Sequence, residues 1–255
     1  MKKILISTLV TCLVFLTGSG TVSAQDDGML VIPVELFACT YNDRQGPDDL
    51  DKVIAKWNAW ADSKAVDDYA AWTLTPYYYG PEQDFDVIWM GAGKDGIALG
   101  RAQDTYLADN DGLDDDFNEV LSCAAHTNFA SINFKAPPEG ATPQNSVLTF
   151  SDCKYEDGAS FTALGAAMAQ WSQHLSDGGS TAGVWHWYPA YGGGGEEFDF
   201  KWLQAYADFE ELGADYERYG NGRGFVTRGR LLGHLIDCDS SRAYLAQSRR
   251  FVQLR

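Results

Sequence analysis

Apolar positions recur along the chain in two rhythms, one typical of strands and one typical of helices. Residues 31–41 form an apolar, β-branched run that ends just after Cys39 and predicts a strand. The next apolar positions recur three, one, three and four residues apart, on one face of a helix; they are Leu50, Val53, Ile54, Trp57 and Ala61. The chain therefore begins with a strand followed by an amphipathic helix.

The pattern after this helix predicts two more strands, a second helix and a closing strand. An aromatic-rich segment runs from Trp72 to Tyr79. Strict alternation then predicts a strand whose apolar face packs on the helices, formed by Phe85, Val87 and Trp89. A helix at about 92–108 and a strand around Cys123 complete the order β-α-β-β-α-β, which is that of a ferredoxin-like unit.

The second half of the chain repeats the first. Segment 39–43 (CTYND) recurs as 153–157 (CKYED), at an offset of 153 − 39 = 114 residues, and segment 84–90 (DFDVIWM) recurs as 197–203 (EFDFKWL). Trp57 corresponds to Trp171 and Cys123 to Cys238 within one residue of that offset. Cys and Trp are rare residues, so their recurrence in order indicates a duplication rather than chance.

A stretch rich in Pro, Gly and Thr, Ala136 to Pro143, separates the two copies and has the composition of a linker. The sequence therefore predicts a first repeat at 25–134, a linker at 135–145 and a second repeat at 146–255.

The N-terminus has the pattern of a secretory signal peptide. Lys2 and Lys3 precede an apolar stretch, and Val22-Ser23-Ala24 supplies small residues for cleavage after Ala24. An uncleaved anchor and a lipid anchor on Cys12 are the alternatives, but the apolar run is shorter than the roughly 20 residues that span a bilayer. We expect a periplasmic or secreted protein that is not held in a membrane after cleavage.

The charge of the chain makes nucleic acid an unexpected partner. The formal charge is −17, and removal of Lys2 and Lys3 with the leader takes it to −19. Such a surface repels phosphate backbones, and solubility after export is a sufficient reason for it.

Of the five cysteines, four remain after cleavage, and an oxidising compartment makes disulfides the default. The first and last strands of a ferredoxin-like unit lie side by side. Of the three connectivities that four cysteines allow, the topology favours Cys39–Cys123 and Cys153–Cys238. No cysteine or histidine spacing indicates a zinc site.

The F-D-x-x-W strands, the Trp-rich helices and the duplication resemble the dimeric α/β-barrel superfamily. This superfamily includes cofactor-independent monooxygenases, NIPSNAP-like proteins and haem-binding relatives such as chlorite dismutases. The resemblance covers nearly the whole mature chain in element order, but it includes no catalytic motif. It implies an α+β fold in which two ferredoxin-like units form a pseudo-symmetric barrel, and fold does not imply function.

Two carboxylates that repeat are candidate acid–base groups. Asp86 and Asp199 follow the repeated Phe85 and Phe198 on the opposite strand face, which would point them toward the space between the sheets. Burial there would raise a carboxyl pKa and suit proton transfer. The alternative is that both lie at a solvated strand end or accept hydrogen bonds from the backbone.

None of the four histidines is repeated, so the shared scaffold does not need them. His186 lies among aromatic residues on a predicted strand and could be a base, a haem ligand or a ligand contact, or it could simply pack in the core. His126, with Asn128 on the last strand of the first repeat, is a second candidate.

Two aromatic runs occupy equivalent places in the repeats. If they line the mouth of the barrel, they form a pocket for a flat or sugar-like ligand, with Tyr77, Tyr79, Trp185 and Trp187 as binding residues. The acidic segment 109–116 does not fit an EF-hand and is interpreted as a solvated loop, and Gly192–Gly195 as a hairpin. Ser160 is the expected cap of a helix.

Three functions remain open from the sequence. The first is a small-molecule-binding barrel without a cofactor, for an aromatic or apolar ligand. The second is a cofactor-independent monooxygenase-like enzyme with His186 or Asp199 as base. The third is a haem protein with His186 or His126 as axial ligand. No metal site is expected, and the protein is expected to be a monomer or a homodimer.

Overall fold

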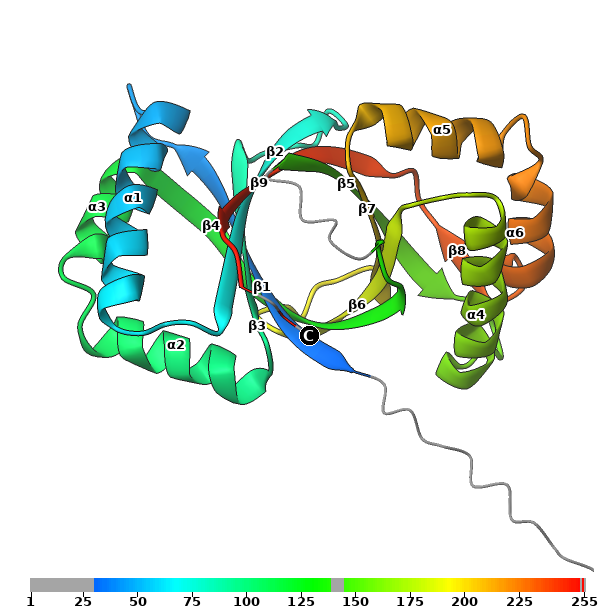
Figure 1. The fold of residues 1–255 in the computed structure, drawn as a ribbon, viewed down its shortest axis with the longest axis horizontal. Helices are drawn as coiled ribbons and strands as arrows, with labels where there is room; N and C mark the ends of the chain where they lie inside the picture. The colour runs from blue at the N-terminus through cyan, green and yellow to red at the C-terminus, as the bar shows by residue number, and fades with distance from the viewer. Residues whose placement is uncertain (1–29, 139–144, 253, 255) are drawn as a thin grey trace, which may run out of the picture.

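The computed structural model describes residues 30–138, 145–252 and 254 (Figure 1). The predicted signal peptide and residues 139–144 of the predicted linker lie outside the described residues. The first repeat contains β1 (Val31–Tyr41), α1 (Pro47–Ser63), β2 (Tyr69–Tyr78), β3 (Val87–Gly93), α2 (Gly96–Ala108), α3 (Leu113–Val120) and β4 (Leu121–Lys135). The second contains β5 (Asn145–Tyr155), α4 (Phe161–Asp177), β6 (Gly183–Tyr191), β7 (Phe200–Tyr206), α5 (Phe209–Tyr219), α6 (Gly224–Leu232), β8 (Ile236–Cys238) and β9 (Arg242–Arg250).

The strands of both repeats close into one antiparallel barrel. The order is β4-β1-β3-β2 in the first repeat and β9-β5-β7-β6 in the second. The halves join where β2 pairs with β9 and β4 pairs with β6. Each repeat thus supplies the strands that pair with both edge strands of the other. The short β8 pairs with β5 beside the barrel. This arrangement confirms the predicted pair of ferredoxin-like units in a pseudo-symmetric α/β barrel.

The inner faces of the strands pack into one apolar cluster that includes Val34, Leu36, Phe129, Phe150 and Trp187. The helices cover the outer faces, α1 to α3 on one side of the barrel and α4 to α6 on the other (Figure 1). Because strand residues alternate between faces, each repeat has a second core between its own helices and the outside of the barrel.

The predicted apolar stripe of α1 is confirmed. All five of its residues are buried, and so are all five of their counterparts on α4, which are Leu164, Ala167, Met168, Trp171 and Leu175. Ser160 caps α4 by accepting a hydrogen bond from the amide of Ala163 (3.2 Å), as predicted. The repeated pair Asp95 and Asp208 caps α2 and α5 in the same way.

Two details of the predicted elements are wrong. The strand predicted from Phe85 begins at Val87, and Phe85 packs inside the barrel whereas Val87 and Trp89 face the helices. The acidic segment 109–116 is a loop only at its start, because α3 begins at Leu113. Leu113 and Val120 are buried, so this part of the segment is an amphipathic helix rather than a solvated loop.

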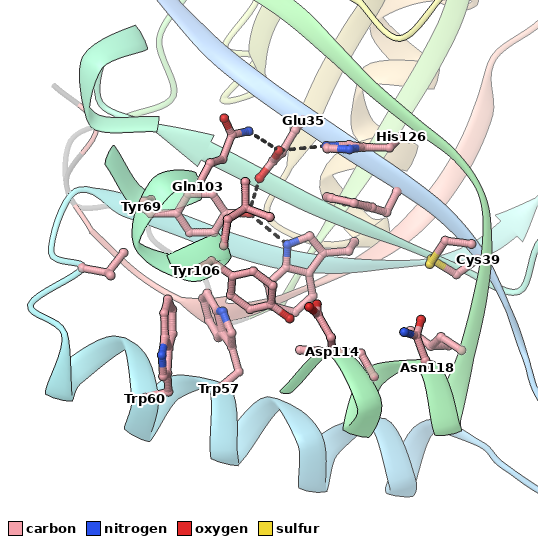
Figure 2. A pocket seen from close by; sticks show the side chains of 18 residues that line it. Glu35, Cys39, Trp57, Trp60, Tyr69, Gln103, Tyr106, Asp114, Asn118 and His126 are labelled. Carbon is pink, nitrogen blue, oxygen red and sulfur yellow. Dashed lines mark hydrogen bonds and ion pairs between the residues drawn. A yellow bond between two sulfur atoms is a disulfide. The ribbon is translucent and has the colours of Figure 1, made fainter. Parts of the chain in front are cut away.

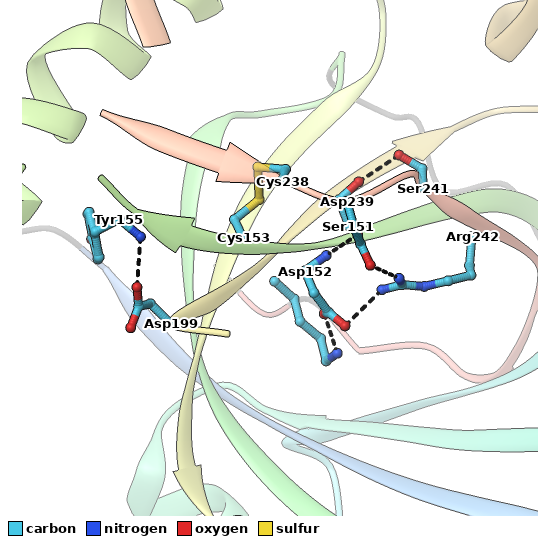
Figure 3. Close-up of a disulfide and its surroundings, with 10 residues drawn as sticks. Ser151, Asp152, Cys153, Tyr155, Asp199, Cys238, Asp239, Ser241 and Arg242 are labelled. Atoms are coloured by element: carbon cyan, nitrogen blue, oxygen red, sulfur yellow. Dashed lines mark hydrogen bonds and ion pairs between the residues drawn. A yellow bond between two sulfur atoms is a disulfide. The ribbon is translucent and has the colours of Figure 1, made fainter. Parts of the chain in front are cut away.

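Both disulfides have the predicted connectivity. Cys39–Cys123 joins β1 to β4, and Cys153–Cys238 joins β5 to β8 (Figure 3). Each links the first strand of a repeat to the chain that follows its last helix. Among the described residues, no helix has the length and hydropathy of a membrane span.

Candidate functional site

A cavity of about 660 Å³ lies between the outside of the barrel and the helices of the first repeat (Figure 2). Its floor comes from β1, β2, β3 and β4, and its walls come from α1, α2 and α3. Pockets for small organic molecules typically have about 300–1,000 Å³. The cavity therefore has the size of a ligand site.

The carboxylate of Glu35 lies at the centre of a hydrogen-bond network in this cavity (Figure 2). Its Oε1 accepts from the Tyr69 hydroxyl (2.8 Å), and its Oε2 accepts from Gln103 Nε2 (2.9 Å) and lies 3.0 Å from His126 Nε2. The Tyr69 hydroxyl accepts in turn from Trp89 Nε1 (3.0 Å). Glu35 is only 5% exposed, so three donors satisfy a carboxylate that water hardly reaches.

Strand alternation places these groups together. Val34 and Leu36 face the barrel interior, so Glu35 between them faces the helices. His126 is the cross-strand partner of Phe37, two residues after Glu35 on the same face, and its ring stacks on that of Phe37 at 3.7 Å. The network is thus a consequence of strand register.

Gly91 of β3 makes room for the Tyr69 hydroxyl. A Cβ at this position would lie 1.8 Å from the Tyr69 oxygen, so any larger residue would displace the ring. Burial and the neighbouring Glu35 carboxylate raise the pKa of Tyr69, which keeps the hydroxyl protonated and able to donate.

Aromatic side chains form most of the remaining wall. Trp57 and Trp60 come from α1, Tyr106 from α2 and Phe117 from α3. Burial and a hydrogen bond to Asp114 raise the pKa of Tyr106. Neither Lys nor Arg lines this cavity among the described residues, and its acidic and basic side chains are those of Glu35, Asp114 and His126.

Of the histidines singled out from the sequence, His126 lies in the cavity and His186 does not. The His186 side chain is fully buried between β6 and the helices of the second repeat, 4.5 Å from the rings of Phe134 and Phe200. Neither of its ring nitrogens has a hydrogen-bond partner in the described chain. Burial lowers the pKa of His186 to about 3, so the ring is neutral and packed in the core.

The prediction that Asp86 and Asp199 face the inside of the barrel is wrong. Both are exposed and accept a hydrogen bond from a backbone amide, that of Tyr41 (2.9 Å) and that of Tyr155 (2.7 Å, Figure 3). They fix the approach of β3 and β7 to the first strand of each repeat, which explains why both copies keep them.

The predicted aromatic pocket at the barrel mouth does not form as a unit. Tyr77 and Tyr79 are 47% and 61% exposed, and Tyr77 packs on Phe209 at 4.4 Å. Trp185 and Trp187 belong to the apolar interior of the barrel. The two pairs lie in different environments because Trp185 and Trp187 lie in the first half of β6, whereas Tyr77 lies near the end of β2 and Tyr79 follows it.

The described residues contain no group of three or more His, Cys, Asp or Glu side chains arranged to hold a metal ion. The glycine run after β6 connects it to its antiparallel neighbour β7, as expected for a hairpin.

Glu35, Tyr69 and Gln103 were not singled out from the sequence. The available signal was the single acidic residue inside the otherwise apolar run 31–39, a position that the second repeat fills with Thr149. A charge within a buried strand requires partners, but sequence alone does not locate Gln103 and His126, which lie 68 and 91 residues away along the chain.

A second cavity, of about 650 Å³, occupies the equivalent place in the second repeat. It is lined by the counterparts of Trp57 and Trp89, which are Trp171 and Trp202. Its polar residues differ from those of the first cavity and include Asp215, Arg218 and Arg228.

Comparison with known proteins supports the fold. No protein-family model and no curated sequence matches the chain. Among solved structures, a protein provisionally named a chlorite dismutase matches with 11% identity and a TM-score of 0.51, over 88% of this chain and 96% of its own. A mutant chlorite dismutase from Candidatus Nitrospira defluvii matches with 10% identity and a TM-score of 0.51, over 85% and 91%. The chain therefore shares the chlorite dismutase-like α/β-barrel fold.

Proposed function

We propose that this protein is an exported binding protein for a small organic molecule, held in the cavity of the first repeat. The observation that carries the proposal is a buried carboxylate, Glu35, among aromatic walls with neither Lys nor Arg beside it in the described chain. The ligand that fits is an aromatic or apolar molecule with an amine or another N–H donor.

The aromatic wall favours such a ligand because aromatic faces attract cations and pack on flat apolar groups. Trp57, Trp60 and Trp89 supply large faces from two sides of the cavity. The net charge of −17 also raises the local concentration of cations around the molecule.

The electrostatics of Glu35 favour the same choice. A buried carboxylate is costly unless it is hydrogen-bonded and paired. The network supplies three donors, and the one ion-pair partner of Glu35 in the described chain is His126, whose side chain is 51% exposed. A ligand ammonium group would supply a positive partner at the remaining lone pair of the carboxylate or in place of the imidazole.

The test is a titration of the purified mature protein with matched probes, tryptamine against 3-ethylindole and benzylamine against toluene, followed by calorimetry. We expect the amines to bind more tightly than the neutral analogues. Glu35→Gln should weaken amine binding by about 10–100-fold, as for loss of a charged hydrogen bond.

Glu82→Gln is the matched control, because Glu82 is exposed, carries the same charge and does not line the cavity. Equal affinities for amines and neutral analogues, or equal losses in the two variants, would contradict the proposal. Asp114→Asn, at the exposed side of the cavity, gives a second readout if Glu35→Gln disturbs the fold.

A second candidate function is acid–base catalysis on the bound molecule. It is favoured by the 3.0 Å contact between Glu35 Oε2 and His126 Nε2, which could orient the imidazole as a base. A bound phenol that loses its proton there would become electron-rich and open to O₂, the co-reactant that a cofactor-independent monooxygenase needs. Oxygen uptake with phenolic substrates should then disappear in His126→Gln while binding persists; uptake that persists would reject this role.

Haem does not fit the two histidines proposed as axial ligands. His186 reaches neither cavity, and His126 turns Nε2 toward Glu35 while Phe37 covers one face of its ring. Added hemin should show no Soret shift that depends on His126 or His186.

Export remains part of the proposal and is supported by the leader pattern and by the two disulfides. The intact mass of the protein from the extracytoplasmic fraction should correspond to a chain that begins at Gln25, less four hydrogens. A full-length mass in the cytoplasm would contradict it.

A further inference from the structure

The two repeats place cavities at equivalent positions but line them with different charges. The cavity of the second repeat contains Arg218 and Arg228, whereas neither Lys nor Arg lines that of the first among the described residues. Glu35 of the first cavity corresponds by register to Thr149 on β5, and His126 to Ser241. The second repeat therefore lacks the carboxylate that defines the first cavity.

We propose that the cavity of the second repeat is a separate site for a flat organic anion, of the aromatic carboxylate class, with Arg228 as its anchor. The guanidinium carbon of Arg228 lies 5.3 Å from the centre of the Trp202 ring. No ion pair of Arg228 is found within the described residues.

The other charges of this cavity are already paired. Asp215 accepts from Arg218 Nη1 (2.6 Å) and from the Ser180 hydroxyl (3.1 Å), and Arg218 also binds Glu211 (3.1 Å). Asp239 pairs with Arg242 and accepts from a backbone amide. Among the described residues that line this cavity, Arg228 is thus the charged side chain left for a ligand.

The surroundings of Arg228 fit a planar carboxylate. A guanidinium held over the face of an indole can direct its N–H edge to a carboxylate and donate two parallel hydrogen bonds. Trp202 is buried, and Tyr206 and Tyr219 add aromatic surface to the same cavity of about 650 Å³. In a protein of net charge −17 an anion gains nothing from the overall field, so recognition depends on this local contact.

The experiment compares 2-naphthoate with 2-naphthamide, by calorimetry on the mature protein and its variants. We expect the carboxylate to bind at least tenfold more tightly than the amide. Arg228→Gln should weaken naphthoate binding about tenfold or more, and Arg228→Lys should restore only part of it because an ammonium lacks the planar fork.

Arg230→Gln is the matched control, because it removes the same charge from the same helix at an exposed position outside the cavity. Glu35→Gln separates the two sites and should leave naphthoate affinity within twofold. The near-ultraviolet circular dichroism of each variant checks its fold. If Arg228→Gln is not folded, the loss of naphthoate affinity is measured in Arg228→Lys instead.

Three outcomes would overturn the proposal. The first is no naphthoate binding up to 10 mM, and the second is equal losses in Arg228→Gln and Arg230→Gln. The third is binding of hemin alone, with a Soret band that disappears in His174→Ala, because His174 also lines this cavity and stacks on Trp171 at 5.3 Å.

Discussion

At the scale of single residues, the cavity of the first repeat depends on a few hydrogen bonds whose partners are distant in sequence. Tyr69 connects two of them, since its hydroxyl donates to Glu35 and accepts from Trp89. Both contacts are largely shielded from bulk water, because Tyr69 and Glu35 are both buried. Loss of this one oxygen would leave a carboxylate oxygen without a donor and an indole N–H without an acceptor.

We therefore predict that Tyr69→Phe lowers the free energy of unfolding by about 1–3 kcal/mol, the cost of orphaned buried polar groups. Urea denaturation should show a lower midpoint with an unchanged m-value. Tyr78→Phe is the control, because the Tyr78 side chain is 58% exposed and should change stability by no more than about 0.5 kcal/mol. Equal effects in both variants would argue against the network.

His186 gives a prediction about pH. Burial holds its pKa at about 3 in the folded protein, whereas an unfolded histidine titrates near 6.5. Between these values the unfolded chain binds a proton that the folded chain does not, so stability falls as the pH falls. The slope that this residue adds is about 1.4 kcal/mol per pH unit at most.

His186→Leu should therefore flatten the loss of stability between about pH 6 and pH 4, as measured by urea denaturation at a series of pH values. It should also stabilise the protein at neutral pH, because it removes two buried nitrogens that have no partner in the described chain. His234→Leu, at an exposed position, should leave the slope unchanged. If the stability of His186→Leu fell with pH at the same rate as that of the unmodified protein, water or another group would have to reach the His186 ring.

At the scale of elements, the repeat predicted the strand order and the disulfides, because Cys, Trp and the apolar stripes recur in register. It did not predict α3 or α6, although Leu113, Phe117 and Val120 have helical spacing. The density of carboxylates in 109–116 concealed that spacing. The orientation of Phe85 toward the barrel interior was not predicted. The Asp86 amide donates a hydrogen bond to the Cys39 carbonyl (2.9 Å) before regular strand pairing begins, so the alternation of faces does not extend back to Phe85.

The candidate site was less predictable than the elements, for a physical reason. Local pattern decides which face a strand residue occupies, but the partners of Glu35 come from α2, β2 and β4. His186 and His126 both lie on strand faces that point to helices, and only packing decides that one meets a cavity and the other a core. Gly91, which admits the Tyr69 hydroxyl, carries no such signal in the sequence.

The disulfides give a prediction at the same scale. They close segments of 84 and 85 residues, so each removes a similar amount of entropy from the unfolded chain. Removal of either disulfide should lower the free energy of unfolding by about 4–5 kcal/mol in the chain-entropy model. The two double variants are Cys39→Ala/Cys123→Ala and Cys153→Ala/Cys238→Ala. Denaturation midpoints of the two double variants test this. A large difference between them would show that contacts in the folded state, rather than loop length, set the contribution.

At the scale of the whole molecule, each repeat depends on the other for its outer strand partners. β2 pairs with β9, and β4 pairs with β6, so a lone repeat would expose the backbone groups of two strands. It would also expose the inner face of its sheet, since the apolar cluster inside the barrel draws on strands of both repeats. Open apolar edges of this kind pair with other chains.

The pseudo-symmetry indicates which pairing should form. Because β4 corresponds to β9 and β6 to β2, the junction of β4 with β6 is equivalent to the junction of β9 with β2. In two copies of the first repeat, β2 of each copy could then pair with β4 of the other.

We predict that the fragment 30–138 forms a homodimer that rebuilds an eight-stranded barrel, with twice the fragment mass in sedimentation equilibrium. A charged residue at the shared edge should shift this dimer toward monomers, and Thr75→Lys on β2 is suitable because Thr75 pairs with Leu245 of β9 in the full chain. A folded monomeric fragment would mean that one ferredoxin-like unit is self-sufficient, and that the barrel is a consequence of duplication rather than a condition for folding.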